Sequence, residues 1–209
     1  MEQMLVTVAL NELKLLDKRI NDKIDNTSFV VSAKESDKNA TKGISKTKYR
    51  TEARAGYESI VDLIKRRQLI KNAITLSNAK THVQVAGMDM TVAEAIEYKS
   101  SIEYQKDLLA TMEMQYSSAV TSMNIANNKV DSTIDSMLEK LYGKDSDKKI
   151  TAEDQDAVAN PYRKANQHAL VDELGIKDRI DELKEFIGKF ESEVDSVLQV
   201  SNCTTVIEF

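Results

Sequence analysis

The feature that most constrains this chain is a long segment, from Thr91 to Tyr142, that contains neither glycine nor proline. Its apolar and aromatic residues recur at alternating intervals of four and three, with Gln105 as a polar member. The repeat comprises Tyr98, Ile102, Gln105, Leu109, Met112, Tyr116, Ala119 and Met123, and continues through Ala126, Val130, Ile134, Met137 and Leu141. This spacing is typical of a helix that buries one narrow stripe against other helices. Unbroken, the helix would extend for roughly 75 Å.

A second repeat of the same kind lies near the C-terminal end of the sequence. It comprises Ile176, Ile180, Leu183, Ile187, Phe190, Val194 and Val197, and we expect it to pack on the long helix. The chain has only six glycines and one proline in 209 residues, and 30% of it is charged, which favours long helices over a sandwich or barrel. The predicted fold is mainly all-α, a long antiparallel helical hairpin or coiled-coil bundle. We expect a single elongated domain over residues 1–209 that assembles into a homo-oligomer.

The remaining segments predict shorter elements. Helices are expected at Met4–Ile24 and from about Thr47 or Thr51 to Leu76, separated by a flexible basic loop at 32–46. Alternating valines with Gly87 predict a small β-hairpin near 82–90, followed by a capping box of Thr91 and Glu94. A short helix is predicted to end at Asn160–Pro161. The β-branched stretch after Gln199 could pair with the hairpin.

No motif in the sequence indicates catalysis or a resident cofactor. Asp145-Ser146-Asp147 departs from a calcium loop because Lys149 occupies a ligand position and the turn glycine is absent. The two histidines, His82 and His168, do not have metal-ligand spacing. We therefore expect no enzyme, no cofactor and no metal site.

The sequence also predicts where the protein resides. A lone cysteine, Cys203, fits a reducing compartment, and neither a signal peptide nor an apolar run long enough for a membrane span is present. The prediction is a cytoplasmic protein without a membrane partner, in the host cytoplasm if a phage encodes it.

Positive charge is concentrated in one segment of a chain whose net charge is −5. Residues 42–71 hold nine lysines and arginines against three acids. Within it, Arg50, Arg54 and Tyr57 share a helical face. Arginines beside tyrosines suit a phosphate with a base, because guanidinium groups bind phosphate and rings stack. A solvated helix start, or salt bridges between subunits, explains the same pattern.

Arg67 lies on the apolar stripe of its helix. An arginine there snorkels, pairs with an acid or meets a ligand.

Three short motifs carry a family resemblance: Ile74-Thr75-Leu76-Ser77-Asn78, Thr91-Val92-Ala93-Glu94-Ala95-Ile96 and Asn202-Cys203-Thr204-Thr205. In this order the chain resembles the septicolysin-like family of small helical bacterial and phage proteins, with residues 120–164 as an insertion. The resemblance implies a helical hairpin with a small β element that self-assembles. The style of the sequence is similar to that of a phage early protein. An all-helical oligomer with an Arg/Tyr cluster and no catalytic constellation is similar to what a phage sponge protein requires, a protein that sequesters cyclic nucleotide immune signals without cleaving them.

These observations lead to one functional hypothesis and two alternatives. The hypothesis is a non-catalytic, oligomeric protein that sequesters a small nucleotide-type anion, as a phage anti-defence sponge would, without binding duplex nucleic acid. The candidate ligand-binding residues are Lys48, Tyr49, Arg50, Arg54, Tyr57, Arg67, Lys71, Asn78, Thr91, Asn202, Thr204 and Thr205. The first alternative is a structural coiled-coil or assembly protein of a phage or bacterium. The second is membrane lysis, which the lack of a helix that is apolar all round disfavours.

Overall fold

The computed structural model describes residues 2–143 and 151–209. The sequence predicts one domain, whereas the contacts group the chain into two compact units, each of which is described separately below. Unit 1 contains Met1–Ser100 and Lys189–Phe209, and unit 2 contains Ser101–Gly188. The charged loop and the calcium-like motif at 144–149 lie outside the described residues.

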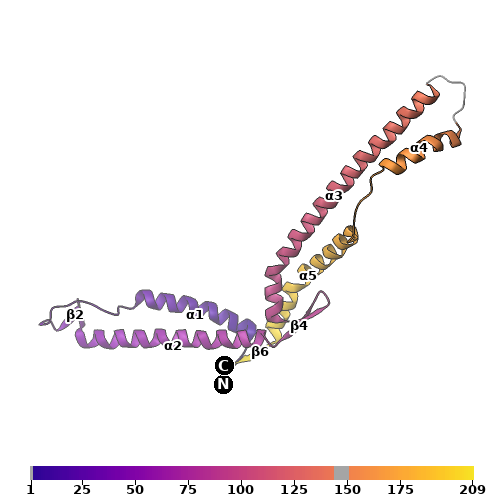
Figure 1. Cartoon of the computed structure of the whole chain (residues 1–209). Helices are drawn as coiled ribbons and strands as arrows, with labels where there is room; N and C mark the ends of the chain where they lie inside the picture. Colours follow the sequence, from indigo (N-terminus) through magenta and orange to yellow (C-terminus); the bar gives the residue numbers. More distant parts are fainter. Residues whose placement is uncertain (1, 144–150) are drawn as a thin grey trace. The chain divides into compact units, whose positions relative to one another are not determined.

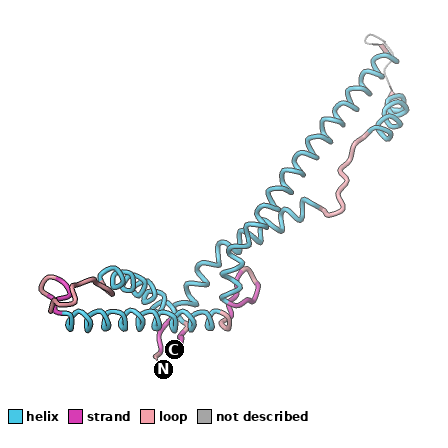
Figure 2. Tube along the Cα trace, turned by 60° about the vertical axis from the view of Figure 1, so that its left-hand side comes forward, coloured by secondary structure: helices cyan, strands magenta, loops and turns pink. Residues whose placement is uncertain are grey.

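Long helices dominate both units, and each sheet in the described ranges has two antiparallel strands (Figure 2). The elements in chain order are β1 (Gln3–Leu5), α1 (Val6–Asn26), β2 (Asn39–Thr41), β3 (Ile44–Ser45), α2 (Lys46–Asn78), β4 (His82–Val85), β5 (Met88–Thr91), α3 (Val92–Tyr142), α4 (Ala152–Asn166), α5 (Ile176–Thr204) and β6 (Val206–Glu208). The prediction of a mainly all-α fold with a small β-hairpin is confirmed.

In unit 1, α1 and α2 run alongside each other as an antiparallel helical hairpin (Figure 1). Their shared core contains Val6, Ala9, Leu13, Leu16, Ile20, Ile70 and Ile74, together with Ile207 of β6. The members from α1 recur every three or four residues, so one face of that helix is buried, whereas Val8 and Leu15 lie outside this face and are 49% and 56% exposed. Hydrophobic burial along this face holds the two helices together.

The strand β6 pairs with β1, which corrects the prediction that the segment after Gln199 pairs with the 82–90 hairpin. The register is Gln3↔Glu208, Met4↔Ile207 and Leu5↔Val206. The helix α5 also continues five residues past Gln199, to Thr204, before the strand begins. Burial of Ile207 in the α1–α2 core explains the choice of partner, because β1 leads directly into α1 and places β6 over that core.

The β4–β5 hairpin turns at Ala86 and Gly87, which both have positive φ, of 52° and 81°. Two successive residues with positive φ form the turn that matches the twist of a two-residue hairpin. Glycine adopts this conformation freely, whereas alanine is strained there. The predicted role of Gly87 is confirmed.

Replacing Ala86 by asparagine is expected to stabilise the protein by about 0.5–1 kcal/mol, because asparagine tolerates positive φ better than alanine. The backbone N–H of Ala86, which donates to Glu193 at 2.7 Å, is retained in this variant. Thermal unfolding followed by circular dichroism measures the change. Ala86→Val is the opposite control, and a β-branched residue there is expected to destabilise the protein. An Ala86→Asn variant that melts below the unaltered chain would contradict the strained-turn interpretation.

The helices α3 and α5 lie alongside each other within each unit, as the two sequence repeats predict (Figures 1 and 2). In unit 1 the ring of Phe190 is 4.8 Å from that of Tyr98, centroid to centroid, and Phe190 is fully buried. In unit 2 the ammonium group of Lys184 pairs with Glu113. The capping box that opens α3 is present, since Thr91 and Glu94 exchange hydrogen bonds.

The helix α4 continues through Pro161 to Asn166, so the prediction that it ends at Asn160–Pro161 is wrong. Proline removes one backbone hydrogen bond from a helix interior. Residues on both sides of it are held on α3: Ala159 packs with Val130 and Ile134, and Arg163 donates to Asp131 at 2.7 Å. These tertiary contacts outweigh the local preference.

The segment predicted as a loop at 32–46 contains the short β2–β3 hairpin and the first residue of α2. Gly43 has a φ of +82° in the tight turn, and the buried Ala40 anchors the hairpin. Strands of two and three residues lie below the length at which alternation in the sequence is detectable. The segment predicted as a flexible basic loop therefore includes a short hairpin that the sequence did not predict.

Candidate functional site

A polar pocket lies in unit 1 where α1 ends and α2 begins. It has a volume of about 260 Å³, and we call it the hairpin-end pocket. Its lining residues are Asn26, Thr27, Ser28, Thr41, Ile44, Tyr49, Glu52 and Ala53. Hydroxyl and amide groups, which can donate hydrogen bonds, dominate this lining, and Glu52 adds one carboxylate, which pairs with Lys48. Of the candidate residues from the sequence, Tyr49 lines this pocket.

Local contacts give the hairpin-end pocket its shape. The hydroxyl groups of Tyr49 and Ser28 share a hydrogen bond at 2.9 Å. Thr27 donates through its hydroxyl to the carbonyl of Lys23 at 2.6 Å. Gly56 of α2 allows Thr27 to lie directly against that helix, because a Cβ at position 56 would lie 2.7 Å from the Thr27 methyl group. The end of α1 therefore rests directly against α2, with the pocket beside the contact.

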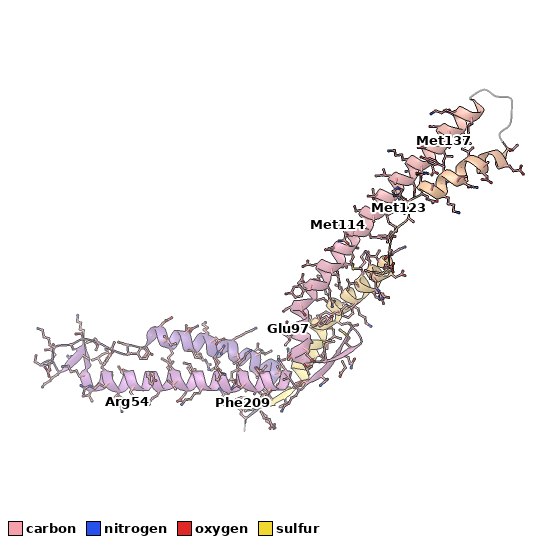
Figure 3. All side chains as sticks on the ribbon, viewed as in Figure 1. Arg54, Glu97, Met114, Met123, Met137 and Phe209 are labelled. Carbon is pink, nitrogen blue, oxygen red and sulfur yellow. The ribbon has the colours of Figure 1, made fainter. Side chains whose placement is uncertain are left out.

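Exposed cations lie on the first turns of α2, near Tyr49 in sequence, but do not line the hairpin-end pocket. Arg50 and Arg54 are exposed, and neither forms an ion pair within residues 2–143 and 151–209. On an α-helix, Arg50 and Arg54 lie about a quarter-turn or more around the axis from Tyr49. Arg54 is labelled on α2 in Figure 3. Tyr57 shares their face and is 60% exposed. Lys48 pairs with Glu52 at 3.7 Å.

Two arginines farther along α2 are held by acids of unit 1. Arg67 donates through Nε to Asp17 of α1, so pairing with an acid accounts for its place on the apolar stripe. Its neighbour Arg66, which the sequence does not single out, donates to Glu12 at 2.6 Å and to both carboxylate oxygens of Glu2 at 2.9 Å. These pairs neutralise two cations in the C-terminal part of the basic segment. Arg50 and Arg54, near the start of α2, stay exposed without an ion pair among the described residues.

Arg66 links α2 to Glu2, the residue that precedes β1, and this contact predicts how the stability of the fold depends on pH. Its hydrogen bonds hold the pKa of the exposed Glu2 carboxyl below its usual value of 4.5. A lowered folded-state pKa means that this contact stabilises the fold above the usual pKa and is lost as pH falls through the lowered one. NMR titration of Glu2 is expected to show the lowered pKa, and Arg66→Met is expected to restore an ordinary one. Arg67→Met is the matched control and leaves Glu2 unchanged. An ordinary Glu2 pKa in the unaltered chain would contradict the contact.

The other candidate residues lie toward the far end of α2. Asn78 is at the C-terminal end of α2, roughly 40 Å along the helix from Arg50. Thr91 is engaged in the cap with Glu94, and the hydroxyl of Thr204 donates to the carbonyl of Val200 at 3.0 Å. The exposed Lys71 and the half-buried Asn202 and Thr205 belong to the same region. One chain therefore does not bring the twelve candidate residues into a single site.

The described residues, 2–143 and 151–209, form neither a cluster of metal ligands nor a membrane-spanning helix. Within those ranges, no group of three or more His, Cys, Asp or Glu side chains is placed to hold a metal ion. His82 lies beside Asp89 in the hairpin, at 3.1 Å. None of the described helices is long and apolar enough to cross a membrane.

Sequence reasoning missed two features of these regions. The short strands that carry Thr41 and Ile44 into the hairpin-end pocket have no periodic signal. The acids that neutralise Arg66 and Arg67 lie about 50 residues or more away along the chain, so spacing does not reveal them. Comparison with protein-family models, with curated proteins and with solved structures finds no match to this chain.

Proposed function

We propose that this chain is a non-catalytic binding protein that sequesters a small nucleotide-type anion at the open end of the α1–α2 hairpin. The observation that carries the proposal is the polar hairpin-end pocket with Tyr49 in its wall. Arg50 and Arg54, one and five residues after Tyr49 on α2, are exposed and form no ion pair among the described residues. A nucleotide needs donors for its phosphate and a ring for its base. The arginines of α2 and the tyrosines Tyr49 and Tyr57 offer both.

The local charge balance supports the same proposal. Between residues 34 and 54 there are seven lysines and arginines and three acids, a net charge of +4, in a chain whose total is −5. A cationic region on an acidic protein attracts a small anion but gives poor affinity for duplex nucleic acid. The pocket volume is near the lower end of small-molecule sites, so the phosphate would sit among the hydroxyls while the base extends outward.

Removing the two unpaired arginines is expected to weaken nucleotide binding by about 10- to 100-fold, since each is a charge-assisted donor. Calorimetry with a panel of cyclic di- and oligonucleotides is the measurement, on the unaltered chain and on Arg50→Gln/Arg54→Gln. Lys65→Gln, an exposed cation paired with Asp62 on the same helix, is the matched control and should leave affinity unchanged. Tyr49→Phe against Tyr49→Ala separates the hydroxyl from the ring. No binding by the unaltered chain at about millimolar ligand would reject the proposal.

A second candidate function is assembly, with this chain as a structural component that packs on its own copies. The observation that favours it is an apolar groove of about 510 Å³ in unit 2. Its lining residues are Leu108, Met112, Leu174, Arg179, Glu182, Leu183 and Phe186. Leu108 and Leu174 are 53% and 69% exposed, and exposed apolar surface of this kind favours protein contacts. A light-scattering mass equal to one chain would contradict assembly. Detection of the protein in purified virus particles would favour it.

A further inference from the structure

The outer edge of β6 presents unpaired backbone groups. In the antiparallel pair with β1, Val6 donates to Thr205 at 3.0 Å, and Glu2 and Phe209 exchange hydrogen bonds. Because such bonds alternate along a strand, the N–H and C=O groups of Val206 and Glu208 point away from β1. Within the described residues β1–β6 is a two-stranded sheet, so nothing pairs with this edge.

A groove runs beside that edge, between β6 and the end of α2. It has a volume of about 360 Å³ and is lined by Ala73, Leu76, Ser77, Lys80, Thr81, Thr205, Val206, Ile207 and Glu208. We call it the β6 groove. Ala73, Leu76 and Ser77 lie on one face of α2 over about 6 Å, and Lys80 and Thr81 follow the end of the helix. These residues form one wall of the groove, and the strand β6, about 10 Å long, forms the other.

We infer that the β6 groove binds an extended peptide segment of a partner protein, which adds to β6 as a third strand. A groove between a strand edge and a helix is a geometry in which main-chain hydrogen bonds give affinity and side-chain contacts give selectivity. The bound segment pairs with the outward N–H and C=O groups of Val206 and Glu208. The helical wall of α2 receives every second side chain of the peptide.

The residues of the groove define the peptide that fits it. Leu76 is 60% exposed and Val206 is 53% exposed, so the side chains that face them are apolar or β-branched. Lys80 is exposed and forms no ion pair among the described residues, which selects an acidic residue opposite it. The carboxylate of Glu208 accepts a hydrogen bond from Gln3 of β1, so Gln3 is its partner, and Glu208 forms no ion pair with Lys80 among the described residues. The preferred sequence therefore alternates apolar and polar residues and contains one Asp or Glu.

The test uses the full chain and a phage-displayed library of random seven-residue peptides. Recovered peptides are synthesised and measured by fluorescence anisotropy. We expect the alternating apolar pattern with an acid, and about tenfold weaker binding to Val206→Pro, which removes one outward N–H donor. Val206→Ala keeps the donor and removes most of the side chain, so the difference between the two variants isolates the lost N–H from the lost apolar contact. Lys80→Gln is expected to weaken only the peptides that carry the acid.

A second measurement leaves the protein unaltered, so it stands even if Val206→Pro fails to fold. Peptides N-methylated at alternate residues are compared with peptides methylated at the intervening residues. One set is expected to lose binding while the other keeps it, because only every second N–H of an added strand faces β6. Failure to recover any peptide above background, or equal binding by both methylated sets, would overturn the inference. A dimer that forms through β6 and is abolished by Val206→Pro would overturn it in favour of a second copy.

Discussion

Replacing Phe190 by alanine is expected to lower the free energy of unfolding by about 3–5 kcal/mol, the largest effect of any single truncation in unit 1. Phe190 is fully buried in α5, with its ring 4.8 Å from the ring of Tyr98 in α3. The truncation removes apolar surface from the core, leaves a cavity and deletes the aromatic pair. Denaturant unfolding followed by circular dichroism measures the change as a lower midpoint.

Phe29→Ala is the matched control for this variant. Phe29 follows α1, is 47% exposed and is the same residue type. Its truncation is expected to change the free energy of unfolding by less than about 1 kcal/mol, because little cavity can form there. Equal losses in the two variants would show that α3 and α5 are not held together by the Phe190 ring in solution.

Replacing Ile207 by alanine is expected to cost about 2–4 kcal/mol, although the residue lies in a strand of only three residues. Ile207 is 3% exposed and packs into the α1–α2 core, so its truncation opens a cavity among helices far from it in the sequence. Val206→Ala, at an adjacent and 53% exposed position, is the control and should cost less than about 1 kcal/mol. A loss at Val206 as large as that at Ile207 would contradict the described register.

The helices were the most predictable part of this fold, because their apolar residues repeat over many turns. Ile102, Val130 and Ile134 belong to the predicted stripe of α3 and are buried. The first residue of the tail repeat, Ile176, is also the first residue of α5. The hairpin at Gly87 and the cap at Thr91 were also predictable, since each depends on residues within a few positions of one another.

The strand pairing was not predictable, because it depends on tertiary contacts. The partner of β6 is decided by burial of Ile207 among α1 and α2, and no local pattern in the sequence encodes that contact. The passage of α4 through Pro161 has the same origin. Packing of Ala159 and the ion pair of Arg163 compensate for a residue that, on local preference alone, ends a helix.

In the candidate site, too, features set by neighbouring residues were predictable, whereas features set by tertiary contacts were not. The shared face of Arg50, Arg54 and Tyr57 follows from helical spacing. The pairing of Arg67 with Asp17 depends on how α1 lies against α2, which spacing does not reveal. The hairpin-end pocket is built from the ends of α1, β2, β3 and the beginning of α2, so its lining becomes visible only when these elements are placed together.

The pairing of β1 with β6 has a consequence for the order of folding during synthesis. Residues 3–5 are made about two hundred residues before their partners at 206–208. While the ribosome is still translating, α1 and α2 can associate, but the apolar site that Ile207 fills is still open. The pairing of β6 with β1 joins segments that are far apart in the sequence, and contacts of this kind slow folding. Until this pairing forms, the nascent helical pair exposes both an incomplete core and an unpaired strand, the features that attract chaperones and promote aggregation.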